Sequence, residues 1–126
     1  MIGPHEGKEL ELMLAGDKKL AFFHDIIPAE GEIAEEIIPE RAFAPYVQEG
    51  RLLRFAGDIP KTGSADVLRF VCFTLPGEEW RAQFILWLKR EWLGGRLEYN
   101  PAHEDIIGNL LGYDAQDIEE YLVNRS

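Results

Sequence analysis

The segment of residues 76–95, PGEEWRAQFILWLKREWLGG, constrains the fold of this chain more than any other. Acidic side chains near its start and basic side chains near its end complement the dipole of a helix, a proline suits the first turn, and two glycines stop the helix. The residues that mark the two ends are Pro76, Glu78, Glu79, Lys89, Arg90, Gly94 and Gly95. The sequence therefore predicts one long, well-bounded helix here.

This helix is apolar on more than one side. At about 100° per residue, a wide apolar face, a second apolar side and a narrow polar corner can be separated. The wide apolar face comprises Trp80, Phe84, Trp87 and Leu88. The second apolar side comprises Leu86 and Leu93, and the polar corner comprises Gln83 and Arg90. We expect a central core helix packed against a sheet, with Trp87 buried deeply enough that its replacement by alanine costs about 3 to 5 kcal/mol. The alternative is that part of the tryptophan face contacts a partner.

Three segments have the composition of strands. Residues 19–27, KLAFFHDII, form one apolar run that Pro28 closes. The runs RLLRFAGDI and DVLRFVCFTL are separated by the turn formers PKTGSA, which predicts an antiparallel hairpin. Arg51, Arg54 and Arg69 fall at solvent-facing or edge positions of these strands. A small antiparallel sheet of about three strands follows.

The remaining elements are helices and one irregular segment. A helix is expected from about His5 to Ala15, stopped by Gly16. Residues 28–50 carry several prolines and acids, which indicates an exposed excursion with one short helix before Gly50.

The C-terminal part predicts a helical hairpin. Asn100 and Pro101 start its first helix and Gly112 ends it, while Asp114 caps the second. The inner stripes of the two helices are Ile106, Ile107, Leu110 and Leu111, then Ile118, Tyr121 and Leu122. This spacing resembles a helix-turn-helix, but no lysine or arginine lies between Leu97 and Asn124. A reader of DNA needs basic and amide side chains there, so direct nucleic-acid binding is disfavoured.

Acidity is the main clue to partners. The 126-residue chain carries a net charge of −10, which repels phosphate backbones and anionic membranes and attracts basic proteins. Carboxylates on the outer side of the hairpin are the candidate partner-binding residues. They are Glu104, Asp105, Asp117, Glu119 and Glu120. A second acidic group, in the irregular segment, comprises Glu30, Glu32, Glu35, Glu36 and Glu40. The plain alternative for both groups is a solvated surface.

Catalytic and metal-binding patterns are weak. His24 precedes Asp25 and His103 precedes Glu104, but neither pair has zinc-site spacing, so no metal, cofactor or catalytic residue is predicted. The single cysteine, Cys72, is expected to be a buried, unreactive thiol. Without a disulfide, a signal peptide or a spanning helix, the expected location is the cytoplasm.

These observations predict a single α+β domain over residues 1–126, with a small antiparallel sheet against the tryptophan-rich helix and a C-terminal helical hairpin. The favoured function is that of a small acidic binder of a basic protein surface: an inhibitor, an immunity or anti-defence (anti-CRISPR-like) protein, or an adaptor. A nucleic-acid-binding protein is one kind of partner with such a surface. The alternatives are a small enzyme that uses His24 or His103 with a carboxylate and, least favoured, a helix-turn-helix protein. The oligomeric state is left open.

Overall fold

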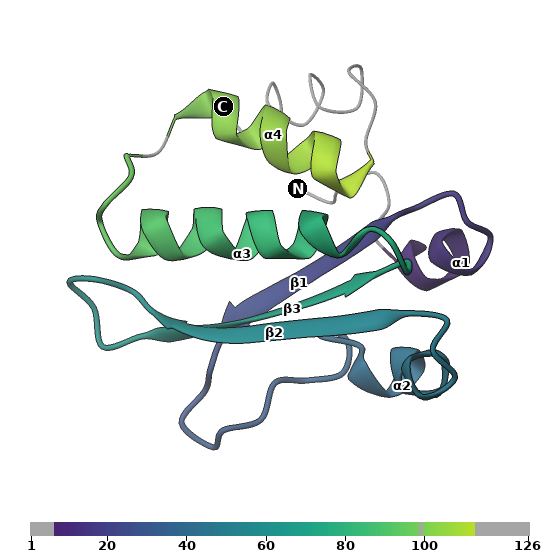
Figure 1. The fold of residues 1–126 in the computed structure, drawn as a ribbon. Helices are drawn as coiled ribbons and strands as arrows, with labels where there is room; N and C mark the ends of the chain where they lie inside the picture. Colours follow the sequence, from purple (N-terminus) through teal and green to yellow (C-terminus); the bar gives the residue numbers. More distant parts are fainter. Residues whose placement is uncertain (1–6, 99, 113–126) are drawn as a thin grey trace.

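The computed structural model describes residues 7–98 and 100–112. Over these residues the chain has an α+β fold, with helices packed on a three-stranded antiparallel sheet (Figure 1). The elements follow in the order α1 (Glu9–Leu14), β1 (Leu20–Ile26), α2 (Glu40–Gln48), β2 (Leu53–Pro60), β3 (Val67–Thr74), α3 (Glu79–Leu93) and α4 (Pro101–Leu111). The fold class predicted from the sequence is confirmed.

The sheet has the strand order β1-β3-β2, so β3 is central and both neighbours are edge strands. Cys72 of β3 stands opposite Phe22 of β1 and Phe55 of β2, and the predicted hairpin of β2 and β3 forms. Four consecutive β3 residues, Phe70 to Phe73, are at most 1% exposed. A run buried at every position requires cover on both faces of the sheet, because neighbouring side chains of a strand point to opposite faces.

Both faces are indeed covered by helices (Figure 1). On one face α3 and α4 enclose a core of Leu20, Ile59, Phe70, Cys72, Ala82, Ile85, Leu86, Leu93 and Leu110. On the other face α1, α2 and the segment before α2 enclose Met13, Ala21, Ile38, Phe43, Leu52, Val71 and Phe73. The sequence predicts the tryptophan-rich helix as cover for the sheet, but it does not predict helices on the opposite face. The feature of the sequence that indicates cover on both faces is the unbroken apolar run within β3.

Local sequence explains where the helices begin and end. Asn100 caps α4 by accepting a hydrogen bond at 2.7 Å from the N–H of Ala102, and Gly112 ends it with a φ of 87°, as predicted. The placement of Pro76 in the first turn of α3 is wrong. Pro76 and Gly77, with φ 91° at the glycine, form a turn that precedes the helix and that Glu78 N–H closes onto Leu75 O at 3.0 Å.

Two basic side chains tie α4 to the rest of the fold. Lys18 Nζ donates to Leu111 O at 2.7 Å, and Arg81 of α3 donates to Leu110 O at 3.2 Å. The last carbonyl groups of a helix lack partners within it and carry partial negative charge, so cations stabilise them. These contacts hold α4 beside α3 and β1, which are its packing neighbours.

Two remaining predictions concern the ends of the chain. The first helix is confirmed over Glu9–Leu14 and starts later than expected, although residues 5 and 6 lie outside the described residues. The second helix of the C-terminal hairpin, with Asp117, Glu119 and Glu120, also lies outside them. Across residues 7–98 and 100–112, none of the helices combines the length and apolar character needed to cross a membrane.

Candidate functional site

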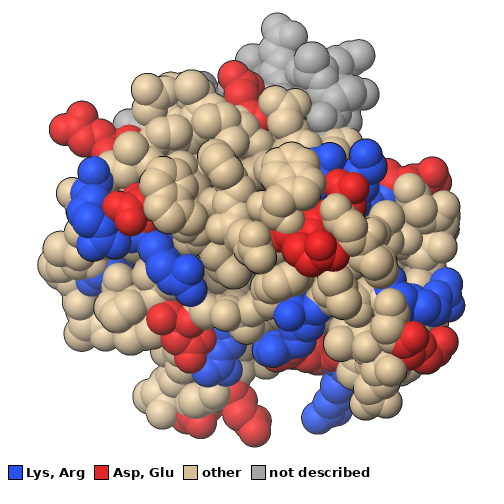
Figure 2. All heavy atoms as spheres, in the orientation of Figure 1, with Lys and Arg blue, Asp and Glu red and all other residues tan. Residues whose placement is uncertain are grey.

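The most conspicuous surface feature is a row of aromatic side chains on α3. Trp80, Phe84 and Trp87 are 52%, 41% and 52% exposed, and the rings of Phe84 and Trp87 are 5.9 Å apart. Their spacing of four and three residues keeps them on one side of the helix. We call these three residues the aromatic face. Figure 2 shows an area without charged residues over α3, with both charge signs at its margins.

The expectation that Trp87 lies in the core is therefore wrong. The inward side of α3 carries Ala82, Ile85, Leu86, Leu88 and Leu93, all at most 6% exposed. The sheet and α4 pack against α3 (Figure 1). The exposed fractions of Trp80, Phe84 and Trp87 show that they leave the aromatic face uncovered in the described structure. Monomeric proteins rarely expose adjoining large aromatic side chains, and such patches mark interaction sites.

Ion pairs and cations border the aromatic face. Arg81 lies 4.7 Å from the centre of the Trp80 ring and pairs with Glu78 at 2.7 Å, and this hydrogen bond lowers the pKa of the Glu78 carboxyl. At the far end of α3, Glu91 pairs with Arg96 at 2.7 Å. A surface with an apolar centre and a polar rim is the usual composition of a protein–protein interface.

The acidic residues predicted to bind a partner are only partly placed. Glu104 is half-buried and Asp105 exposed, both near the start of α4, where negative charge also stabilises the helix dipole. Asp117, Glu119 and Glu120 lie outside the described residues, so the structure does not bring the five together.

The second acidic group is partly occupied by structural contacts. Both carboxylate oxygens of Glu35 accept backbone N–H bonds at 3.1 Å, from Arg41 and Ala42 at the start of α2. Glu40 pairs with Arg54 at 2.6 Å. Two members of this group therefore serve the fold rather than a free acidic display.

Of the two predicted histidines, His24 does not face the carboxylate of its neighbour Asp25. The His24 ring lies 5.4 Å from the rings of Phe22 and Phe70; desolvation, and then the charge of Lys89, lower its pKa. Asp25 is the next residue of the strand and so points to the opposite face of the sheet, where it accepts the N–H of Ile26. His103 is half-buried in the first turn of α4, beside Glu104 in the sequence.

The described residues contain neither a reactive thiol nor a cluster of metal ligands. Burial raises the pKa of the Cys72 thiol to about 12, which leaves it protonated and unreactive, as the sequence indicated. Among residues 7–98 and 100–112, no three histidine, cysteine or acidic side chains gather in a way that would hold a metal ion.

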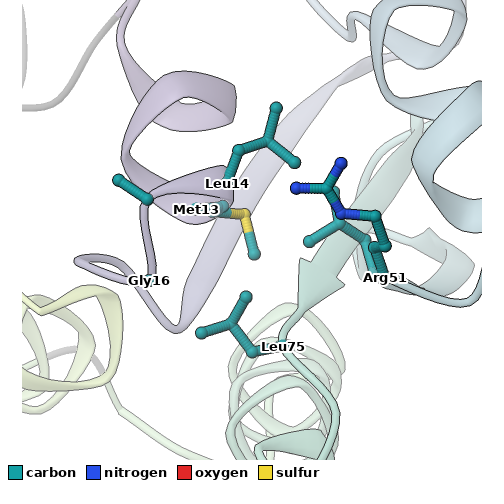
Figure 3. Close-up of a pocket in the computed structure, with 7 residues that line it drawn as sticks. Met13, Leu14, Gly16, Arg51 and Leu75 are labelled. Carbon is teal, nitrogen blue, oxygen red and sulfur yellow. The ribbon is translucent and has the colours of Figure 1, made fainter.

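A hollow of about 320 Å³ lies beside the end of α1 and was not predicted (Figure 3). Its lining residues are Met13, Leu14, Ala15, Gly16, Arg51, Leu52 and Leu75. Figure 3 shows the Arg51 guanidinium beside Leu14 and Met13, and the same group lies 5.3 Å from the Tyr46 ring. Arg51 is the one charged side chain of this lining, so the hollow has little with which to orient a ligand.

The aromatic face is thus the strongest candidate for a functional site. Its residues belong to the wide apolar face predicted from the sequence, for which contact with a partner is the alternative to burial. Comparison of the chain with protein-family models, with curated proteins and with solved structures finds no match.

Proposed function

We propose that this protein acts by binding another protein and that the aromatic face of α3 supplies the central contacts. The observation that carries the proposal is the exposure of Trp80, Phe84 and Trp87 side by side on one rigid helix. Tryptophan is among the residues that contribute most to binding when an interface buries it. A helix packed against a sheet also presents such side chains with little loss of conformational freedom on binding.

The charge of the chain supports a partner with a basic surface. A net charge of −10 steers basic proteins toward the molecule and accelerates their encounter with it. Glu104 and Asp105 on α4 are the described carboxylates that we assign to this role. Exposed aromatic contacts and negative charge together suit a protein that acts in the cytoplasm as an inhibitor, an immunity or anti-defence protein, or an adaptor.

The test compares two double variants of the full chain. Trp80→Ser/Trp87→Ser removes the aromatic anchors, and Ile26→Ser/Ile37→Ser removes two apolar side chains that are 46% and 44% exposed outside α3. Each protein is immobilised, partners are captured from source-cell extract with cross-linking, and the partner identified by mass spectrometry is purified and titrated. We expect the first variant to lose binding and the second to keep it. Equal binding by both would overturn the proposal.

The electrostatic part has its own measurement on the purified partner. Glu104→Lys/Asp105→Lys should slow association, and added salt should weaken wild-type binding, because rim charges act mainly on the association rate. Glu11→Lys/Glu49→Lys, which makes the same change of net charge at two exposed positions outside α3 and α4, is the control for net charge. An association rate that follows net charge alone would remove Glu104 and Asp105 from the contact.

A further inference from the structure

The spacing of the aromatic face is symmetric along α3. Trp80 and Trp87 are about 20° apart around the helix and about 10 Å apart along it, and Phe84 lies between them. Successive spacings of four and three residues are those of the contact seam between two helices that pack at a small angle. If a second α3 runs in the opposite direction, Trp80 of each helix meets Trp87 of the other, and the two Phe84 side chains meet at the centre.

Charges along one margin of the face have the same symmetry. Glu79 and Arg90 are eleven residues apart, which places them within about 20° of each other on the same side of α3, near its two ends. The Arg90 guanidinium lies close to Gly57 of β2. A side-chain Cβ at position 57 would be 3.0 Å from Arg90 Nη2. Ion pairs among the described residues include Glu40–Arg54, Asp58–Arg69, Glu78–Arg81 and Glu91–Arg96. Neither Glu79 nor Arg90 takes part in them, although Glu79 Oε1 accepts the N–H of Gly77 at 2.6 Å.

The two midpoints nearly coincide. The midpoint of Trp80 and Trp87 falls just before Phe84, and that of Glu79 and Arg90 falls just after it, about 1.5 Å further along the axis. A single two-fold axis near Phe84 therefore brings the apolar residues together and places Glu79 of each copy beside Arg90 of the other. A surface that complements itself under a two-fold axis is what a symmetric dimer requires.

We propose that a second copy of this chain covers the aromatic face, with the two α3 helices antiparallel about a two-fold axis at Phe84. The antiparallel arrangement also places the positive end of each helix dipole beside the negative end of the other. Glu91, which lies in line with the aromatic residues, already pairs with Arg96 beyond the last of them. The contact therefore does not bury an unpaired charge at that position.

The dimer also regulates the site, an extension that rests on the proposed function. Two chains of net charge −10 repel each other, so the association is weak, whereas a basic partner is attracted by the same charge. The second copy thus protects the aromatic face until a partner of complementary charge displaces it.

The first experiment measures the mass of the full chain by sedimentation equilibrium over the micromolar range. Wild-type protein is expected to pass from monomer to dimer as concentration rises. Trp80→Ser/Trp87→Ser should remain monomeric, whereas Ile26→Ser/Ile37→Ser should dimerise like wild type. Circular dichroism and urea unfolding establish that each variant is folded.

Charge exchange then tests the orientation of the helices. Glu79→Arg and Arg90→Glu should each weaken the dimer by about tenfold or more, because each creates two like-charge contacts. The double variant Glu79→Arg/Arg90→Glu should restore dimerisation, and so should an equimolar mixture of the two single variants, since each heterodimer contains two opposite-charge pairs. Lys61→Glu, exposed in the loop between β2 and β3, controls for net charge.

The outcomes separate this inference from the proposed function. Wild-type protein that stays monomeric throughout, or a dimer that the charge exchanges neither weaken nor restore, overturns the inference. If partner binding still depends on Trp80 and Trp87 in that case, the proposed function stands alone. A dimer with the expected rescue, whose aromatic variant still binds the partner, would support the inference and remove the proposed function.

Discussion

Lys18 is an unusual residue because its side chain is only 1% exposed. Its ammonium group donates to Leu111 O at 2.7 Å, and burial, opposed by the charge of Glu9, lowers its pKa from 10.5 to about 8. Between these two values the unfolded chain holds a proton that the folded protein has released. The free energy of unfolding therefore rises with pH over this range, since the cost of burying the charge disappears as Lys18 becomes neutral.

Replacing Lys18 by methionine removes this dependence. From pH 7 to pH 10 the wild-type protein should gain up to about 3 kcal/mol relative to Lys18→Met, at about 1.4 kcal/mol per unit of pKa shift. Urea unfolding of both proteins at several pH values measures the difference. If the two curves run parallel, the Lys18 pKa is not lowered in the folded state.

Comparing the two proteins is necessary because Cys72 acts in the opposite direction. Burial raises the pKa of its thiol from 9.0 to about 12, so only the unfolded chain loses this proton above pH 9. The stability that this thiol contributes is fully present below pH 9 and is lost as pH rises toward 12. Both proteins retain Cys72, so its contribution cancels in their difference.

Thr74 offers a second residue-scale prediction. It is fully buried, and within the described structure its Oγ1 has no hydrogen-bond partner. Thr74→Val replaces the hydroxyl by a methyl group of similar shape and should raise the free energy of unfolding by about 1 kcal/mol, because a buried polar group without a partner is costly. Thr74→Ser, which keeps the hydroxyl and loses the methyl group, is the control. A destabilised valine variant would indicate that the hydroxyl is bonded.

At the scale of elements, α3 shows why an apolar helix need not be buried all round. Helical periodicity places Leu88 on the same wide face as Trp80 and Trp87. Leu88 is nevertheless 5% exposed, whereas Trp80 and Trp87 are each 52% exposed. Leu88 lies about 80° from Trp80 and about 100° from Trp87 around the helix, so the line at which the cover of α3 ends can fall between them. The position of that line depends on α4 and the sheet, which are remote in sequence.

The exposure of Trp87 lowers the loss of stability that is expected for Trp87→Ala. The variant should lower the free energy of unfolding by about 1 kcal/mol or less, since half of the side chain is exposed and alanine favours the helix. Ile85→Ala, in the same helix but fully buried, should cost about 2 to 5 kcal/mol. Chemical unfolding of both variants gives the comparison. Similar losses would return Trp87 to the core.

At the scale of the whole molecule, net charge is the property that bears on the expected class of partner. The net charge of −10 is spread over a chain with 23 acidic and 13 basic residues. Of the basic residues described, Arg54, Arg69, Arg81 and Arg96 already pair with carboxylates. The excess of acidic over basic residues therefore repels the phosphates of a nucleic acid.

We expect no binding to duplex DNA at about 0.15 M salt, where screening reduces the range of charge to about 8 Å. Mobility-shift titration of the full chain up to high micromolar concentration is the measurement, with a basic DNA-binding domain as the positive control. A sequence-specific shift under these conditions would make the helix-turn-helix spacing of the C-terminal segment functional.

The sequence by itself determined the local elements: the strands, the end of α3 at Gly94, and the start and stop of α4 at Asn100 and Gly112. These depend on dipoles, caps and apolar periodicity, which neighbouring residues specify. Only the tertiary structure decided that helices cover both faces of the sheet and that Trp80, Phe84 and Trp87 remain outside. The periodicity of apolar residues indicates that a helix has an apolar surface. Whether that surface is buried depends on a second surface, which is supplied by distant parts of the chain or, as we propose, by another molecule.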